Sequence, residues 1–294
     1  MRGHELPDRP LKARERHQLR KHSFDAGARL YDRFRPGYPE PLFNDLVRMS
    51  GIPVAGRILE IGPGTGQATL PLARRGFSIT GIELGASMAR LCRENLAAFP
   101  NVEILNTAFE DWQPVGHDRN RPAISDRVPR ADCPEPFDLA LSATAFHWIP
   151  AKLAFTRCAK VLRPSGSLAL LWNFVDVPDN RFYNDLRALY RRIAPQVHLS
   201  KPPEERILRQ SRKITSSGLF GPVTILRYPW QKEYTADSYI GLLKTMSDHA
   251  ILAPKVRNEV FRAIRKLIDA HGGSFVRPVI AVLFLAPRRS SAGT

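Results

Sequence analysis

Residues 58–70 read ILEIGPGTGQATL. The stretch begins with a short run of apolar and β-branched residues, which predicts a buried strand over residues 57–61. An acid, Glu60, comes at the end of this run, and three glycines, Gly62, Gly64 and Gly66, separate it from a helix-like sequence. Glycines at the junction of a strand and a helix let the backbone approach a bound cofactor closely. The stretch therefore predicts a cofactor site in an α/β fold.

The spacing of the glycines separates the cofactors that such a turn can hold. A phosphate-binding loop needs a Lys directly after its last glycine, and none follows Gly66. A dinucleotide fold needs a third glycine at the position where Gln67 stands. The pattern thus argues against ATP, GTP and nicotinamide dinucleotides.

Two acids favour S-adenosylmethionine as the cofactor. A carboxylate at Glu60 would repel a bound diphosphate but attracts an ammonium group, and S-adenosylmethionine has an ammonium group and no phosphate. Glu83 ends the next predicted strand, where a carboxylate can accept hydrogen bonds from both ribose hydroxyls. The alternative for Glu83 is a cap of the helix that follows it.

Further residues are expected to surround the cofactor because they follow the ends of predicted strands. Phe109 offers an apolar face to the adenine ring, and Glu110 or Asp111 could meet its exocyclic amine. Met88 belongs either to the adenine pocket or to the core. The remaining predicted contacts with the cofactor are Gln67, Leu84, Ala108 and Ser142.

Strand and helix signals alternate along the first part of the chain, which predicts a mostly parallel sheet with helices on both faces. In such sheets the ligand lies beyond the carboxyl ends of the strands. We expect strands over residues 57–61, 77–84, 101–109, 137–143, 167–173, 223–230 and 275–285. We expect helices over residues 41–49, 65–74, 86–98, 151–162, 180–192, 202–213, 235–246 and 255–269.

The predicted organisation is one large domain with two appendages. Residues 1–22 are charged without an apolar core, and we expect a basic flexible arm rather than a secretory signal. Residues 23–287 form the domain, and residues 288–294 form a short tail. Residues 114–136 are polar, rich in proline and without periodicity, so we expect a disordered insert. Residues 174–220 and 234–270 are expected to form a substrate-binding cap.

The composition limits partners and compartment. The formal net charge of +16 permits binding to nucleic acid, but the basic residues are scattered and not interleaved with aromatic residues. We therefore favour a small-molecule partner. Three widely spaced cysteines show neither disulfide nor metal spacing, which predicts a reducing cytoplasmic environment and no metal. No apolar run is long enough to span a bilayer. We expect a monomer or homodimer.

At these residues the sequence resembles the class I S-adenosylmethionine-dependent methyltransferases. The matching segments are ILEIGPGTGQAT, GIELGASM, NTAFEDW and FDLALSATAFHWI. Two others, YDRFRPGYP and LLKTMSDHAIL, resemble the small-molecule subgroup that includes trans-aconitate methyltransferases. The resemblance extends from about residue 24 to residue 287. The glycine motif is common to many class I enzymes, whereas its combination with AFHWI and RPGYP is more specific.

The resemblance implies a seven-stranded Rossmann-like sheet whose last strand is inserted antiparallel, with a small helical cap. It also implies that Tyr31 and its neighbours cover the cofactor, and that the segments after the fifth strand form the cap. The insert at residues 114–136 departs from the family pattern, which connects these strands briefly.

His147 follows the fourth predicted strand, where the methyl group should point, and is the candidate catalytic residue. It could act as a general base, contact the acceptor or cofactor, or have a structural role. A hydroxyl acceptor needs a base, whereas a carboxylate acceptor needs none. Arg35, Arg181 and His249 are candidates for contact with an acidic substrate.

Three functions remain open from the sequence. The leading one is methyl transfer to a small organic acceptor, either a carboxylate or a hydroxyl. The second is methylation of RNA, which the net charge suggests. The third is a non-catalytic protein that binds S-adenosylmethionine, because a fold alone does not establish turnover.

Overall fold

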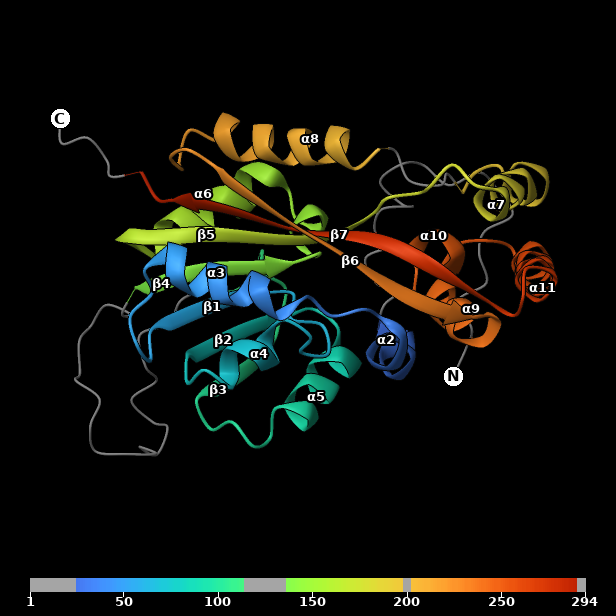
Figure 1. Ribbon diagram of the computed structural model, residues 1–294. Helices are drawn as coiled ribbons and strands as arrows, with labels where there is room; N and C mark the ends of the chain where they lie inside the picture. The colour runs from blue at the N-terminus through green and yellow to red at the C-terminus, as the bar shows by residue number, and fades with distance from the viewer. Residues whose placement is uncertain (1–24, 114–135, 198–201, 290–294) are drawn as a thin grey trace.

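The computed structural model describes residues 25–113, 136–197 and 202–289. The predicted arm (1–22), nearly all of the predicted insert (114–136) and most of the tail lie outside these residues. Within them, seven strands form a single sheet in the order β3-β2-β1-β4-β5-β7-β6 (Figure 1). The strands are β1 (Arg57–Ile61), β2 (Ser78–Glu83), β3 (Val102–Asn106), β4 (Phe137–Ala143), β5 (Leu162–Val175), β6 (Thr224–Thr235) and β7 (Ser274–Pro287).

Strands β1 to β5 are parallel to one another, and β7 is antiparallel to both of its neighbours, β5 and β6. The α/β fold and the antiparallel insertion of the last strand are therefore confirmed. The chain runs from β1 outward to β3 and then returns to the other side of β1 with β4. The order thus reverses between β1 and β4, and in open α/β sheets the ligand lies beside such a reversal, beyond the carboxyl ends of the strands.

Helices cover both faces of the sheet, as Figure 1 shows. The helices are α2 (Ala28–Phe34), α3 (Glu40–Ser50), α4 (Thr69–Ala73), α5 (Ala86–Asn95), α6 (Ala151–Val161), α7 (Arg181–Ile193), α8 (Pro203–Ser216), α9 (Ala236–Lys244), α10 (Ser247–Ala250) and α11 (Pro254–Ala270). Two short 3₁₀ helices are η1 (Asp25–Gly27) and η2 (Phe146–Trp148). Residues of α3, α4 and α5 share one core cluster with the sheet, and those of α6 and α8 share the other.

A third core cluster lies apart from these two. It is formed by α7, α9 and α11 together with Tyr234 and Phe275 at the far ends of β6 and β7. The two strands pair over twelve residues, from Thr224↔Leu285 to Thr235↔Ser274, and their far ends extend past the other strands to meet these helices (Figure 1). We refer to α7, α9, α10, α11 and the far ends of β6 and β7 as the cap.

The structure shifts several predicted boundaries. The helix expected from residue 65 begins at Thr69, because Gly66 has a φ of 99°, outside the helical region. The third strand ends at Asn106 rather than at residue 109. Strand β6 extends to Thr235 rather than to residue 230, because the polar residues at its far end continue the pairing with β7 into the cap. Strand β5 begins at Leu162 rather than at residue 167, and β7 begins at Ser274 and ends at Pro287.

Candidate functional site

The glycine turn directly follows β1 at the point where the strand order reverses. Gly62, Gly64 and Gly66 have φ values of 68°, 64° and 99°. Side chains strongly disfavour this left-handed region, so the three glycines are needed for the turn. A Cβ atom on Gly62 would lie 2.4 Å from the Cβ of Ala145, which follows β4. The glycine turn thus packs closely against the segment that follows β4.

Glu60, in β1, is a buried acid. Its side chain is 0% exposed, and neither carboxylate oxygen has a hydrogen-bond partner among the described residues. Burial raises its pKa to about 7; the Thr69 side chain opposes this rise, and the charge of Glu83 adds to it. A buried, unsatisfied carboxyl group is costly for a folded protein unless a ligand completes its interactions. An ammonium group is the ligand that would do so.

Glu83 is held in place by backbone amides on both sides. Gly64 donates to its Oε2 and Gly85 donates to its Oε1, each at 2.9 Å. Burial raises the pKa of Glu83, and the two amides oppose the rise. Each oxygen keeps a further lone pair, so the carboxylate can still accept from two hydroxyls. The carboxylate therefore joins the glycine turn to the residue before α5.

The N-terminus of α5 is capped by Asp25, a residue that the sequence did not indicate for this role. Asp25 accepts hydrogen bonds from the amides of Ser87 (2.6 Å) and Met88 (3.2 Å). An acid thus reaches the helix N-terminus from a segment about sixty residues earlier, which local capping rules cannot detect. Glu83 was the other candidate for capping this helix. It accepts a hydrogen bond from the amide of Gly85, the residue before the helix.

The residues predicted around the adenine ring lie on two neighbouring segments. Met88 is buried and packs with Ala28. Phe109 is buried, and its ring stacks on Trp112 at 6.0 Å between centroids. Ala108 and Glu110 are half-buried. The connection between the two segments is fixed because the Asn106 side chain donates to the carbonyls of Glu83 and Leu84, each at 3.0 Å.

Three other predicted contacts have defined surroundings. Tyr31 on α2 lies over the glycine turn, since a Cβ atom on Gly64 would be 3.5 Å from its ring. The Ser142 hydroxyl is buried and donates to the Ile61 carbonyl at 2.8 Å, so this hydroxyl joins β4 to β1. The Gln67 side chain donates to Thr65 Oγ1 at 2.7 Å.

A strained residue follows β4. Thr144 has a φ of 57°, which is rare for a β-branched residue. Its hydroxyl is 2.7 Å from the hydroxyl of Tyr38, and its amide donates to the Leu171 carbonyl at 2.8 Å. Burial raises the pKa of Tyr38, and nearby Glu60 adds to the rise while Thr144 opposes it. The sequence singled out neither residue, because the strain arises only in the folded chain.

His147, the predicted catalytic residue, lies in η2 and is exposed. Its ring centroid is 4.7 Å from that of Trp148 and 6.5 Å from that of Trp172. An exposed imidazole that follows β4 is accessible for proton transfer, and the aromatic neighbours limit its orientations.

The three residues that the sequence suggested for contact with an acidic substrate do not form one group. Arg35 donates to the Thr245 hydroxyl (2.9 Å) and carbonyl (2.8 Å), which joins α2 to the end of α9. His249 is buried between Tyr190 and Asp248, whose oxygens lie 2.7 and 2.8 Å from its two ring nitrogens. Arg181 is exposed at the start of α7.

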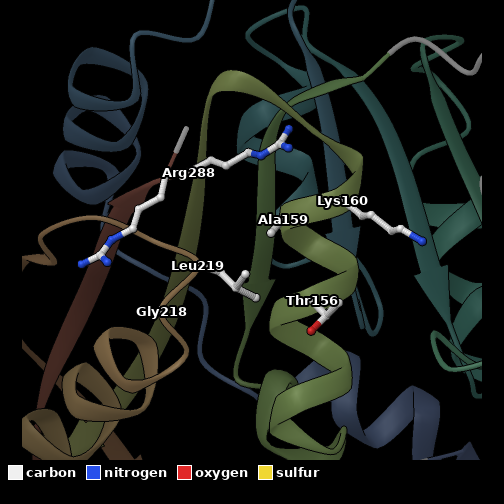
Figure 2. A pocket seen from close by; sticks show the side chains of 7 residues that line it. Thr156, Ala159, Lys160, Gly218, Leu219 and Arg288 are labelled. Carbon is white, nitrogen blue, oxygen red and sulfur yellow. The ribbon is translucent and has the colours of Figure 1, made fainter. Parts of the chain in front are cut away.

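A recess of about 350 Å³ lies at the opposite edge of the sheet, where the parallel strands begin (Figure 2). The Lys160 side chain points away from Leu219 (Figure 2). The Arg288 guanidinium donates to the Leu162 carbonyl. The recess is thus separate from the glycine turn, which lies at the carboxyl ends of the strands. The residues that line it are Thr156, Ala159, Lys160, Gly218, Leu219, Arg288 and Arg289.

Two kinds of feature were not found within residues 25–113, 136–197 and 202–289. No helix there is both long and apolar enough to cross a membrane. No group of three His, Cys, Asp or Glu side chains is placed to hold a metal ion.

Comparison with known proteins gives the family of the glycine turn and its surroundings. Residues 58–166 match the family model described as a methyltransferase domain. The chain is an S-adenosylmethionine-dependent methyltransferase. The methyltransferase is 27% identical over 251 residues to an uncharacterised methyltransferase of Mycobacterium tuberculosis, covering 85% of this chain and 86% of that one. It is 29% identical over 168 residues to an uncharacterised methyltransferase-like protein of Schizosaccharomyces pombe, covering 56% and 57% of the two chains.

Solved structures share the fold at low sequence identity. The YcgJ protein of Bacillus subtilis has a TM-score of 0.51 and 13% identity, covering 86% of this chain and all of that one. Phosphoethanolamine N-methyltransferase 2 of Haemonchus contortus, crystallised with phosphomonomethylethanolamine and S-adenosylhomocysteine, has a TM-score of 0.51 and 16% identity, covering 96% of this chain and 61% of that one. The methyltransferase thus has the class I fold, and the unsatisfied Glu60 and the oriented Glu83 fit S-adenosylmethionine.

Proposed function

We propose that the methyltransferase transfers the methyl group to a small organic acceptor, at a carboxylate or hydroxyl oxygen, by in-line displacement. The observation that carries this proposal is the cap, which has its own apolar core and stands beyond the strand ends where the cofactor site lies. Such a cap suits a ligand that is enclosed on several sides. The trans-aconitate methyltransferase subgroup, which two segments of the sequence resemble, acts on acceptors of this kind.

The residues of the chain have separate roles in this proposal. Glu60 would hold the ammonium group of the cofactor, and Glu83 would accept from its ribose hydroxyls. Tyr31 would cover the cofactor, and the contacts predicted for Gln67, Leu84, Met88, Ala108, Phe109, Glu110 and Ser142 remain part of the proposal. S-adenosylmethionine, when bound, supplies an already activated methyl group, so positioning of the acceptor provides much of the rate. A carboxylate acceptor needs no base, whereas a hydroxyl acceptor would give its proton to His147.

Calorimetric titration with S-adenosylmethionine, NAD and ATP tests the cofactor part. We expect binding of S-adenosylmethionine alone, weakened about ten-fold or more in Glu83→Ala, because hydrogen bonds to a charged acceptor contribute about 1.5–3 kcal/mol each. Glu259→Ala, on the exposed side of α11, is the control for loss of one negative charge. Absence of binding in the wild-type protein would refute the assignment.

Turnover assays with a labelled methyl donor test the acceptor part. Carboxylic acids, phenols and tRNA are compared as acceptors. Label in a carboxylic acid or a phenol supports the proposal. Label confined to tRNA refutes it.

RNA methylation is the second candidate, supported by the net charge of +16. A ribosomal RNA small subunit methyltransferase A of Alkaliphilus oremlandii is 31% identical over 65 residues, which is 22% of this chain and 23% of that one. A match to less than a quarter of either chain does not show a shared acceptor. Binding to tRNA that weakens steeply with salt would favour this candidate, and no association at low salt would exclude it.

A non-catalytic role is the third candidate. It predicts binding of S-adenosylmethionine together with no transfer to any member of a broad acceptor pool. The strained Thr144 beside the cofactor turn argues against it, because strain that serves no reaction is a cost to folding.

A further inference from the structure

A short segment, residues 35–39, connects α2 to α3 and reads RPGYP. The side chain of Asn173, on β5, donates to the Gly37 carbonyl at 2.9 Å. The ring of Tyr38 meets the ring of Phe43 edge-on, with 6.4 Å between the centroids. Tyr38 is therefore held both through its backbone neighbour and through its ring, which gives its hydroxyl a defined position.

The Tyr38 hydroxyl is paired with the hydroxyl of Thr144, 2.7 Å away, and neither hydroxyl bonds any other described residue. Two hydroxyl groups carry two protons, and the hydrogen bond between them uses one. Both residues are half-buried, so the pair is not sealed inside the core. The pair thus has one O–H donor left for a ligand.

The strained backbone of Thr144 has an explanation in this pair. Its φ of 57° is one that a glycine adopts readily and a β-branched residue does not. What a threonine adds over a glycine at this position is its side chain, and the hydroxyl of that side chain is the group bonded to Tyr38. Strain that persists in a folded protein commonly serves a ligand or a reaction.

The hydroxyl pair lies beside the acid that is proposed to hold the ammonium group. Glu60 of β1 is the neighbour of Leu141 on the parallel strand β4, and Thr144 follows three residues later. The next residue, Ala145, packs against Gly62 of the glycine turn. Thr144 therefore stands where the chain leaves the sheet next to the cofactor turn.

The surroundings of the phenol keep it protonated. Burial raises the pKa of Tyr38, and the hydrogen bond with Thr144 opposes this rise. Tyr31 and Glu60 add to the rise, whereas the charge of Arg35 opposes it. The phenol is therefore neutral at physiological pH, so it can donate a hydrogen bond but cannot act as a phenolate base. The positive charge of Arg35 also favours an anion beside the phenol.

We propose that Tyr38 and Thr144 bind the carboxylate of the amino-acid group of S-adenosylmethionine, through the one hydroxyl proton that their own hydrogen bond leaves over. The carboxylate and the ammonium group of an α-amino acid share one carbon, so a donor for the first must lie close to an acceptor for the second. Glu60 is that acceptor in the proposed function, on which this assignment rests. A hydrogen bond from a hydroxyl to a carboxylate is charge-assisted and stronger than a neutral one.

The test compares S-adenosylhomocysteine with its decarboxylated analogue, which keeps the ammonium group and lacks only the carboxylate. Both are titrated by calorimetry into the full-length protein. We expect S-adenosylhomocysteine to bind at least ten-fold more tightly, the effect of one hydrogen bond to a charged group.

Removal of both hydroxyls decides between a ligand role and a structural one. Tyr38→Phe combined with Thr144→Val leaves no hydroxyl proton, so neither residue can replace the other. This double variant should bind S-adenosylhomocysteine about ten-fold more weakly and should bind the decarboxylated analogue as the wild-type protein does. Thr144→Ser keeps the hydroxyl and should keep the preference for the carboxylate.

Tyr228→Phe is the matched control. The Tyr228 hydroxyl donates to Asp45 at 2.7 Å, and Tyr228 packs against the same core cluster as Tyr38. This variant therefore loses a phenol hydrogen bond of equal length that does not adjoin the glycine turn. The preference for S-adenosylhomocysteine over the analogue should be unchanged.

Three outcomes would overturn the assignment. The first is equal binding of the two ligands by the wild-type protein, and the second is an undiminished preference in the double variant, which would leave the pair to the acceptor. The third is equal weakening of both ligands in the double variant, which would mean that the hydroxyls serve the fold. Failure of the wild-type protein to bind either ligand would instead refute the proposed function, so the two failures are distinguishable.

Discussion

Replacement of the buried acid Glu60 by Gln should change the stability of the ligand-free protein in a pH-dependent way. The folded pKa of Glu60 is about 7, against an ordinary value of 4.5, and its causes are burial and the charge of Glu83, opposed by Thr69. A raised pKa means that the folded state binds the proton more tightly than the unfolded state. The stability that the neutral carboxyl gives is fully present below pH 4.5 and is lost as the pH rises through 7.

The magnitude follows from the difference in pKa. A shift from 4.5 to about 7 corresponds to about 3 kcal/mol at about 1.4 kcal/mol per unit, most of which appears between pH 5 and pH 8. Gln carries no charge at either pH, so its own packing cost cancels when the two pH values are compared. The change in unfolding free energy caused by Glu60→Gln should therefore be more favourable at pH 8 than at pH 5 by about 2–3 kcal/mol.

Urea unfolding at pH 5 and pH 8 measures this difference, with Glu259→Gln as the control for the loss of one carboxylate from the whole chain. An equal effect of Glu60→Gln at both pH values would refute the reasoning. It would mean that the carboxyl group carries the same charge in the folded and the unfolded state at each pH. The same variant should bind S-adenosylmethionine more weakly at pH 8. Stability gained and binding lost together would indicate that Glu60 is kept for the ligand rather than for the fold.

Three other substitutions test the packing around the site. Gly62→Ala should lower the unfolding free energy by about 1–3 kcal/mol, since its φ is 68° and the new Cβ would lie 2.4 Å from that of Ala145; an unchanged urea midpoint would contradict this. Asp25→Ala should cost about 1 kcal/mol by uncapping α5, measured by thermal unfolding, and Asp25→Asn should retain most of the stability. Tyr38→Phe should cost about 1 kcal/mol because it leaves the Thr144 hydroxyl without its 2.7 Å partner, and no loss in urea unfolding would argue that water replaces the phenol.

Much of the site was predictable because its determinants are local. The glycine spacing and the two acids, Glu60 and Glu83, are properties of short segments, and the parallel strands bring the segments to one edge of the sheet. Asp25, Tyr38 and Thr144 were not predictable, because each acts on a partner far away in the chain.

The sequence by itself determined the class of fold and the kind of cofactor. A few neighbouring residues set the periodicity of a strand or helix. They also set where glycines allow a positive φ and where an acid stands at the end of a strand. The tertiary structure decided how far β6 and β7 extend, which helices form the cap, and how Glu60 comes to be buried without a partner. Those features depend on contacts between residues distant in the sequence, and burial and charge at a site have values only once the whole chain has packed around it.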